Sequence, residues 1–60
     1  MTRKEKFYKV YSNLPIPLRR EIVVVIDKEP ISWSVAKIEI DGGTELGEKI
    51  LEQLSNFKFI

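Results

Sequence analysis

The sequence predicts a small α+β domain in which an N-terminal helix, a β-hairpin and one or two C-terminal helices share a single core. Apolar residues recur at helical spacing near both ends of the chain, and five consecutive β-branched residues lie in its middle. The chain has 60 residues, a length that allows one domain and the burial of only about 60% of its unfolded surface. We therefore expect residues 1–60 to form one domain with a modest core.

Residues 2–13 are expected to form an amphipathic helix. Its buried stripe would consist of Phe7, Val10, Tyr11 and Leu14. Thr2 is a suitable N-cap, and Glu5 three residues later completes a capping box. Pro15, with a second proline two residues later, ends the helix because proline disfavours the α conformation in the residue before it. Residues 14–18 are therefore expected to be an ordered, extended connector.

The clearest strand covers residues 21–27. Its central residues, Ile22 to Ile26, are all β-branched and favour a pleated strand over a helix. The run does not alternate with polar residues, so we expect both faces of the strand to be covered. Residues 27–30 predict a turn, after which residues 31–33 would return as a short second strand and complete a hairpin.

Residues 32–41 fit two structures. A helix capped by Ser32 or Ser34 would align Trp33, Ala36 and Ile40 on one stripe. A strand would move its apolar side from one face to the other in mid-run, which favours the helix. The alternative is a longer hairpin that ends at the glycines of positions 42 and 43.

The segment from Thr44 to about residue 56 predicts a second amphipathic helix. Thr44 is its expected cap, and Glu45 and Glu48 lie near the positive end of the helix dipole. The apolar face would consist of Leu46, Ile50, Leu51, Leu54 and Phe57. Residues 57–60 have the composition of a short edge strand.

Side-chain chemistry gives little support for catalysis. The chain contains no Cys and no His, which removes disulfides, thiolate metal sites and the most frequent general base. Paired carboxylates, at Asp27 and Glu29 and at Glu39 and Asp41, flank expected turns, where solvated charge is ordinary. No Ser or Thr has a recognisable activating base. We therefore expect no catalytic residue, no metal, no cofactor and no small-molecule substrate.

No segment has the pattern of a membrane span or a secretion signal. The longest apolar run has five residues, against roughly 20 for a spanning helix. The N-terminus opens with charge and lacks an apolar stretch, so a cytoplasmic location is the default expectation. Charged residues make up 32% of the chain, against about 25% on average, a bias that suits a thermophile.

Charge is unevenly divided along the chain, although the net charge is only +1. Residues 1–20 carry six basic side chains against one acidic, and residues 21–60 carry four basic against eight acidic. This polarity indicates a basic surface for an acidic partner or charge complementarity between subunits, unless two solvated faces simply cancel. A nucleic-acid-binding protein is therefore the alternative hypothesis, with contacts from Arg3, Lys4, Lys6, Tyr8, Arg19 and Arg20.

Association with another chain is the favoured hypothesis. A core this small supplies roughly 3–5 kcal/mol of stability, and without disulfides or metals a partner is the remaining source of more. Gly47 lies on the apolar side of the second helix, where glycine costs about 1 kcal/mol relative to alanine. Close approach of another backbone, within the subunit or across a dimer, would explain it. The expected association surface consists of Gly47, Ile50, Leu54, Phe57 and Trp33.

Three stretches of the chain together carry a family resemblance. They are Leu14-Pro15 with Arg19-Arg20, the run Val24-Val25-Ile26-Asp27-Lys28-Glu29-Pro30-Ile31-Ser32-Trp33, and Thr44-Glu45-Leu46-Gly47 followed by Ile50-Leu51. The chain resembles a group of short, uncharacterised prokaryotic proteins, and this resemblance implies no residue-level activity. Proteins of this size and type are often antitoxin-like partners of another protein. We therefore expect a non-enzymatic interaction module, antitoxin-like or an adaptor, that forms a homodimer and binds another protein.

Overall fold

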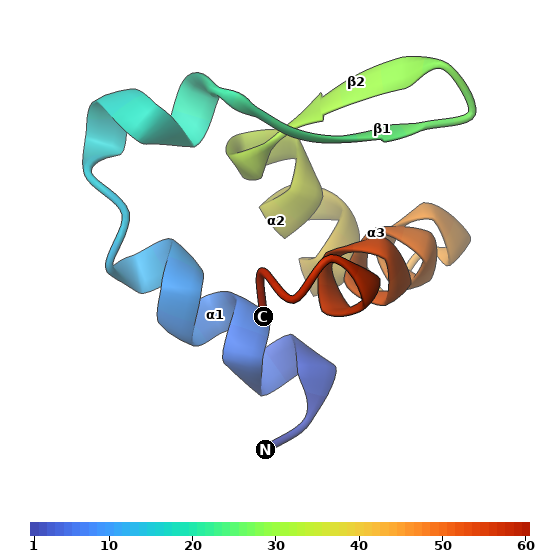
Figure 1. Cartoon of the computed structure of the whole chain (residues 1–60), viewed down its shortest axis with the longest axis horizontal. Coiled ribbons are helices and arrows are strands. Elements are labelled where there is room, and N and C mark those ends of the chain that lie inside the picture. Colours follow the sequence, from blue (N-terminus) through green and yellow to red (C-terminus); the bar gives the residue numbers. More distant parts are fainter.

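The computed structural model describes all 60 residues as helices, a hairpin and short connections. In chain order the elements are α1 (Arg3–Ser12), the 3₁₀-helix η1 (Ile16–Arg20), β1 (Ile22–Ile26), β2 (Glu29–Ser32), α2 (Trp33–Asp41) and α3 (Glu45–Asn56). The hairpin lies across one end of α2, with α3 beside α2, while α1 contacts both of these helices (Figure 1). The predicted α+β arrangement of a helix, a hairpin and two helices is confirmed.

The α-helices begin at cap residues that the sequence indicates. Thr2 Oγ1 accepts a hydrogen bond from the Glu5 N–H at 3.1 Å, and the Glu5 carboxylate accepts one from the Thr2 N–H at 3.2 Å. Ser32 Oγ accepts from the Val35 N–H at 3.2 Å, and Thr44 caps α3 in the same way. These bonds satisfy N–H groups that the first turn of a helix leaves unpaired. The capping box is confirmed, and residues 33–41 form the helix rather than the strand.

The connector after α1 differs from the prediction. An extended segment was expected over residues 14–18, but Ile16–Arg20 form the 3₁₀-helix η1. Pro15 is extended, with a ψ of 142°, and caps η1, while Pro17 lies in its first turn. Proline suits that position because its fixed φ fits a helical turn and the first turn needs no N–H donor. The two prolines therefore end α1, as expected, and also start the next turn.

The hairpin turn is shorter than the sequence suggests. Ile26 pairs with Glu29, so Asp27 and Lys28 alone form the turn, with φ angles of 49° and 69°. Left-handed values at both turn residues give a twist that matches the flanking strands. The second strand was expected at residues 31–33. It begins instead at Glu29, and Trp33 already belongs to α2.

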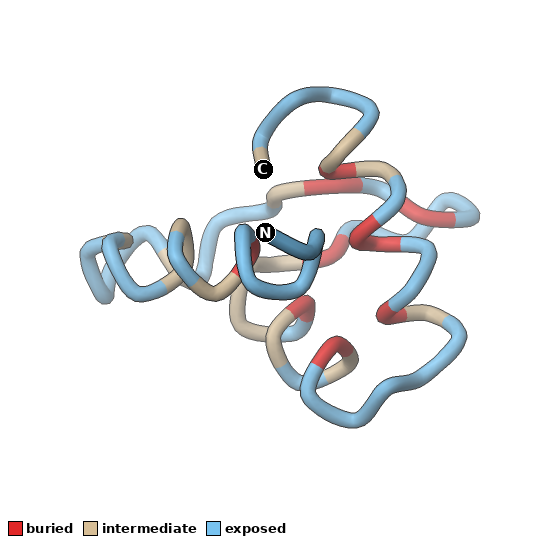
Figure 2. The backbone as a smooth tube through the Cα atoms, turned by 90° about the horizontal axis from the view of Figure 1, so that it is seen from below, coloured by how far each residue is buried: buried red, intermediate tan, exposed pale blue.

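Nine buried apolar side chains form the core. They are Phe7, Val24, Ile26, Ile31, Ala36, Ile40, Ile50, Leu51 and Leu54. Figure 2 shows the buried residues as short stretches on a backbone that is otherwise largely exposed. Nine other large apolar residues keep 43% or more of their surface exposed. The number of large apolar residues that the fold leaves in contact with water therefore equals the number of residues in its core, Ala36 included.

One face of β1 is uncovered, contrary to the prediction that both faces would be buried. Val24 and Ile26 face the core and are 7% and 6% exposed, whereas Ile22 and Val25 are 54% and 58% exposed. The helices pack on one side of the two-stranded hairpin, as Figure 1 shows, and no element of the chain lies over the other side. The apolar side chains of Ile22 and Val25 therefore remain in contact with water in the single chain.

The residues after α3 form no strand. Lys58 has a φ of 61°, and the N–H groups of Lys58 and Phe59 donate to the carbonyls of Ser55 and Leu54 at 3.1 and 2.9 Å. This pair of bonds around a left-handed residue is a Schellman motif, which turns the chain away from the helix axis. Phe57 was expected on the buried face of the helix, but it caps the helix end and is 63% exposed.

Candidate functional site

The five residues predicted to form an association surface do not form one surface. Gly47, Ile50 and Leu54 are buried, and the two larger side chains have no exposed area. Trp33 is half-buried, and its ring lies 6.0 Å from that of Phe7. Phe57 alone is exposed. Of the predicted association surface, only Phe57 is therefore fully available to a partner.

The close approach at Gly47 occurs within the subunit. Gly47 is the third residue of α3, and a Cβ placed on it would lie 2.5 Å from the carbonyl oxygen of Glu39 and 2.8 Å from its carbonyl carbon. These are backbone atoms of α2, which cannot move aside as a flexible side chain can. The same carbonyl oxygen accepts hydrogen bonds from the N–H and the hydroxyl of Thr44, both at 3.2 Å. Gly47 therefore serves the corner between α2 and α3.

The predicted nucleic-acid contacts divide into two groups. Arg3, Lys4, Lys6 and Arg20 are exposed and take part in neither of the two salt bridges of the chain. Tyr8, expected as a free stacking ring, is half-buried and packs edge-on against Phe7, with ring centroids 5.9 Å apart. Arg19 is also engaged within the fold. Two of the six side chains therefore already have partners inside the molecule.

Arg19 fastens η1 to its neighbours. Its Nη2 donates to the Tyr11 carbonyl oxygen at 3.2 Å, and its guanidinium carbon lies 4.4 Å from the centroid of the Tyr11 ring. The Arg19 carbonyl oxygen accepts a hydrogen bond from the Ser34 hydroxyl at 2.9 Å. A guanidinium over an aromatic face is attracted by the charge distribution of the ring. These contacts join η1 to α1 and α2.

Tyr8, Asp41 and Lys37 form a cluster of titratable groups between α1 and α2. The Tyr8 hydroxyl donates to the Asp41 carboxylate, which also accepts from Lys37 Nζ at 2.7 Å. The hydrogen bond to Asp41 raises the pKa of Tyr8 above 10.0 and that of Lys37 above 10.5, and the bonds from Lys37 and Tyr8 lower the pKa of Asp41 below 3.8. All three pKa values move away from neutrality, whereas a general acid or base needs a pKa near the working pH. The cluster therefore acts as a tie between two helices.

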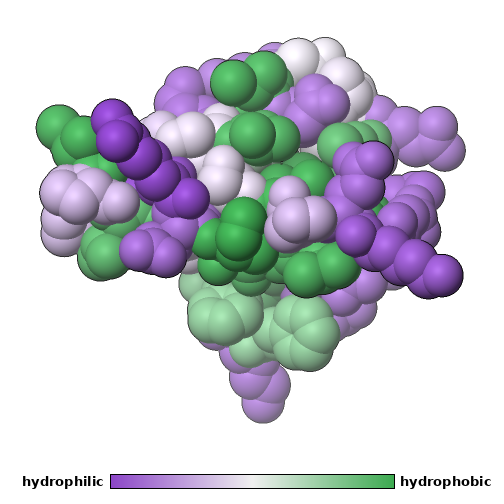
Figure 3. All heavy atoms as spheres, turned by 90° about the horizontal axis from the view of Figure 1, so that it is seen from above, coloured by the Kyte–Doolittle hydropathy of each residue, from purple (hydrophilic) through white to green (hydrophobic).

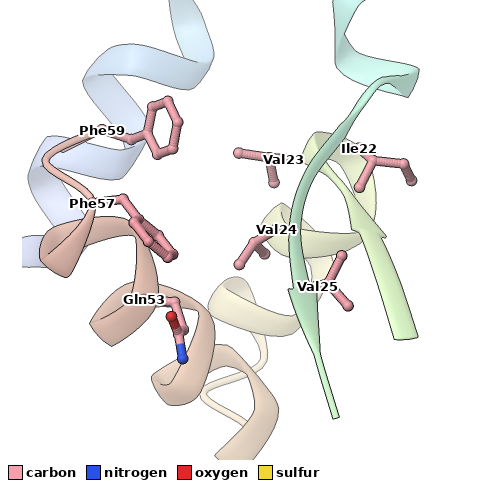
Figure 4. A pocket seen from close by; sticks show the side chains of 7 residues that line it. All are labelled: Ile22, Val23, Val24, Val25, Gln53, Phe57 and Phe59. Carbon is pink, nitrogen blue, oxygen red and sulfur yellow. The ribbon is translucent and has the colours of Figure 1, made fainter. Parts of the chain in front are cut away.

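An apolar groove opens between β1 and the C-terminal tail. Its volume is about 400 Å³, and six of its seven lining residues are hydrophobic. The lining residues are Ile22, Val23, Val24, Val25, Gln53, Phe57 and Phe59. Figure 4 shows Val23 and Val24 pointing across the groove toward the two phenyl rings. We call the exposed apolar residues at this place the groove patch, which consists of Ile22, Val25, Phe57 and Phe59.

The groove contains no charged side chain, and Gln53 is its only polar lining residue. Figure 3, which looks onto the hairpin, shows apolar side chains gathered across this face with hydrophilic side chains around them. A contiguous apolar area with a polar rim is typical of a surface that binds another protein or an apolar ligand. The chemistry available here is therefore apolar contact together with the backbone hydrogen bonding of β1.

Three of the four residues of the groove patch were not predicted from the sequence to form a surface. Ile22 and Val25 were assigned to a strand buried on both faces, and the fold covers only one of these faces. The absence of polar residues from the strand was the observation that could have identified them. Phe59 belongs to no periodic pattern, because it follows the turn at Lys58 that ends α3.

The structure contains neither a membrane-spanning helix nor a metal-binding cluster. None of the helices is both long and apolar enough to cross a membrane. No three acidic side chains are placed to hold a metal ion together.

Comparisons with known proteins transfer no function to the chain. The chain matches no model of a known protein family, no curated protein and no solved structure. Its function must therefore be inferred from the surface itself.

Proposed function

We propose that the protein is a non-enzymatic interaction module that associates with itself and binds protein through the groove patch. The observation that carries this proposal is the exposure of four large apolar residues, between 54% and 63%, around one groove. Removing apolar surface from water contributes about 25 cal/mol per Å². A partner that covers the groove patch would therefore gain free energy that the single chain cannot gain by folding.

The small size of the core supports the same proposal. Nine buried apolar residues make up the core of the domain, and a core of this size leaves a margin of roughly 3–5 kcal/mol. A partner that binds only the folded chain stabilises it by mass action. Association would therefore both perform the function and support the fold.

The groove favours protein over nucleic acid as the partner. Nucleic-acid binding depends on Lys and Arg side chains that neutralise phosphates, and none of these lines the groove. The uncharged lining also lacks the acid, base or nucleophile that an active site requires. In an antitoxin-like or adaptor role, a second protein with an apolar segment would occupy the groove patch in competition with self-association.

Sedimentation equilibrium of a matched pair of variants tests the proposal. Phe57→Ser/Phe59→Ser removes two apolar side chains of the groove patch. The control Ile16→Ser/Ile38→Ser removes side chains that are 72% and 67% exposed but do not line the groove. We expect the wild type and the control to exceed the monomer mass of 7.0 kDa as concentration rises, and the patch variant to stay at that mass.

Two results would contradict the proposal. One is a wild type that remains monomeric and captures no protein from an extract of its own cells in a patch-dependent manner. The other is equal loss of association in the patch variant and in the control. Salt-dependent retention on DNA or RNA, abolished by charge reversal at Lys6 and Arg20, would instead support the nucleic-acid alternative.

A further inference from the structure

We infer that the groove patch binds a second copy of this chain, whose β1 pairs antiparallel with the outer edge of β1 to form a four-stranded sheet. This inference rests on the proposed function and specifies its partner and geometry. Three features carry it: a strand edge with free backbone groups, an apolar groove along that edge, and a blocked edge on the other strand of the hairpin.

The outer edge of β1 has backbone groups that no strand satisfies. The sheet contains only β1 and β2, and Val25 pairs with Pro30 one step from the pair that closes the turn. In an antiparallel ladder, pairs that exchange hydrogen bonds alternate with pairs that do not. Pro30 has no N–H, so its pair with Val25 is of the second kind. The N–H and C=O of Val25 therefore point outward, where another strand can bond to them.

The groove runs along this same edge. Four consecutive residues of β1 line it, although successive side chains of a strand point to opposite faces. The backbone edge between the two faces must therefore border the groove. A register shift between Ile22 and Val24 marks a bulge, and Figure 4 shows Val23 and Val24 directed to the same side, toward Phe57 and Phe59. A strand added at the edge would have an apolar floor.

A second β1 suits this edge in its side chains as well as its backbone. Residues 22–26 are all apolar, so an added β1 presents no polar side chain to the groove. On one face of the joined sheet, the pair Ile22 and Val25 of one copy would lie beside the pair Ile22 and Val25 of the other copy. Apolar pairs of this kind across neighbouring strands stabilise sheets. Two-fold symmetry gives both copies these contacts at once, which accounts for the apolar residues on the uncovered face of β1.

The other edge of the hairpin is protected against pairing. The outer edge of β2 carries Pro30, which lacks an N–H, beside the exposed, charged Glu29. Proline and charge are features by which proteins keep edge strands from recruiting further strands. Each copy therefore offers one edge for pairing. The sheet order would be β2–β1–β1–β2, and the assembly closes at two copies instead of growing into a fibre.

A mixed-label NMR experiment on the full chain tests the inference. Isotope-labelled and unlabelled protein are unfolded together, refolded and examined for contacts between copies. We expect these contacts to join β1 of one copy to β1 of the other. In the unmixed wild type, we expect the Val25 amide to become protected from hydrogen exchange as concentration rises, because its N–H points to solvent in the single copy.

The possible outcomes separate the inference from the proposed function. A dimer whose contacts between copies lie elsewhere, for example around Ile38 of α2, would overturn the inference. A monomer that binds a different protein through the groove patch would overturn the inference and the proposed self-association, but leave the proposed protein binding by the groove patch in place. A monomer with no patch-dependent protein binding would overturn both.

A pair of substitutions at one position isolates the backbone contribution. Val25→Pro removes the outward N–H while leaving the bonds between β1 and β2 in place. The control Val25→Thr keeps the N–H and the branched shape but makes the side chain polar. We expect Val25→Pro to weaken the dimer roughly 100-fold, since two symmetric bonds are lost, and Val25→Thr to weaken it less than about 10-fold. An equal loss of dimer affinity in both variants would overturn edge pairing. If Val25→Pro does not fold, the NMR contacts between wild-type copies provide the test.

Discussion

The α2–α3 corner and the outer edge of β1 are both rich in apolar residues, but those at the corner are buried and those at the edge are exposed. At the corner, Gly47 lets two helices approach to backbone contact, and Ile50 and Leu54 have no exposed area. At the edge, Ile22 and Val25 are more than half exposed, although every residue of β1 is apolar. The packed helices α2 and α3 enclose the apolar residues that lie between them, whereas the two-stranded hairpin leaves one face and one edge open. Buried contacts that stabilise the fold are therefore concentrated at the corner, and the surface that we propose for binding lies at the edge.

The largest effect on stability is expected when one apolar side chain is truncated in each region and the two losses are compared. Ile50→Ala should cost about 2–5 kcal/mol, because it removes buried contacts and leaves a cavity. Val25→Ala should change the free energy of unfolding of the dilute, unassociated chain by less than about 0.5 kcal/mol. Urea unfolding followed by circular dichroism measures both. Similar losses in the two variants would contradict the contrast between a closed and an open region.

A smaller effect tests the closeness of the corner. Gly47→Ala should destabilise the fold by about 1–3 kcal/mol, because its Cβ would meet backbone atoms of Glu39 and force α2 and α3 apart. The matched control is Gly42→Ala, whose Cβ would meet its nearest neighbours at 3.5 Å, an ordinary contact, with φ at −77°. Urea midpoints compare the two variants. A Gly47→Ala variant as stable as the control would show that the helices can separate freely.

The smallest effect concerns the exposed tie that joins the N-terminal helix to the corner. The lowered pKa of Asp41 means that its contribution to stability is present above its ordinary pKa of 3.8 and is lost as pH falls through the lowered value. The pKa of Lys37 and that of Tyr8 are raised, so their contributions are present below their ordinary values and are lost as pH rises through the raised values. The tie is therefore complete at neutral pH.

Asp41→Asn should remove this pH dependence. We expect the variant to be slightly less stable than the wild type at neutral pH and equal to it once the pH is below the lowered pKa of Asp41. Thermal unfolding at the two pH values measures the difference. The control is Glu52→Gln, which changes an exposed acidic residue that takes part in neither salt bridge. A difference that persists in acid would show that Asp41 acts through packing and not through its charge.

The parts of the fold that depend on neighbouring residues could be predicted from the sequence. Thr2, Ser32 and Thr44 cap their helices because an N-cap bonds to an N–H only three residues away. The five β-branched residues of β1 form a strand for an equally local reason. The turn residues Asp27 and Lys28 were predicted only within a longer segment, since several residues there favour turns.

The candidate site could not be predicted in the same way, because burial depends on the whole assembly of elements. The sequence shows that β1 is apolar on both faces, but not that the chain has one layer of helices to cover it. It shows that Gly47 needs a close neighbour, but not that Glu39 supplies it. The exposure of Phe57 follows from the Schellman motif at Lys58. Lysine is not a residue type that indicates a helix end, so the sequence did not predict this turn.

The turn that joins β1 to β2 depends on the rest of the molecule for its conformation. Both of its residues, Asp27 and Lys28, have left-handed φ angles, and such a conformation costs an ordinary side chain roughly 1 kcal/mol or more. The burial of Val24, Ile26 and Ile31 against the helices offsets this cost. Cut away from the helices, a peptide with the sequence of the hairpin would therefore be marginally stable at best.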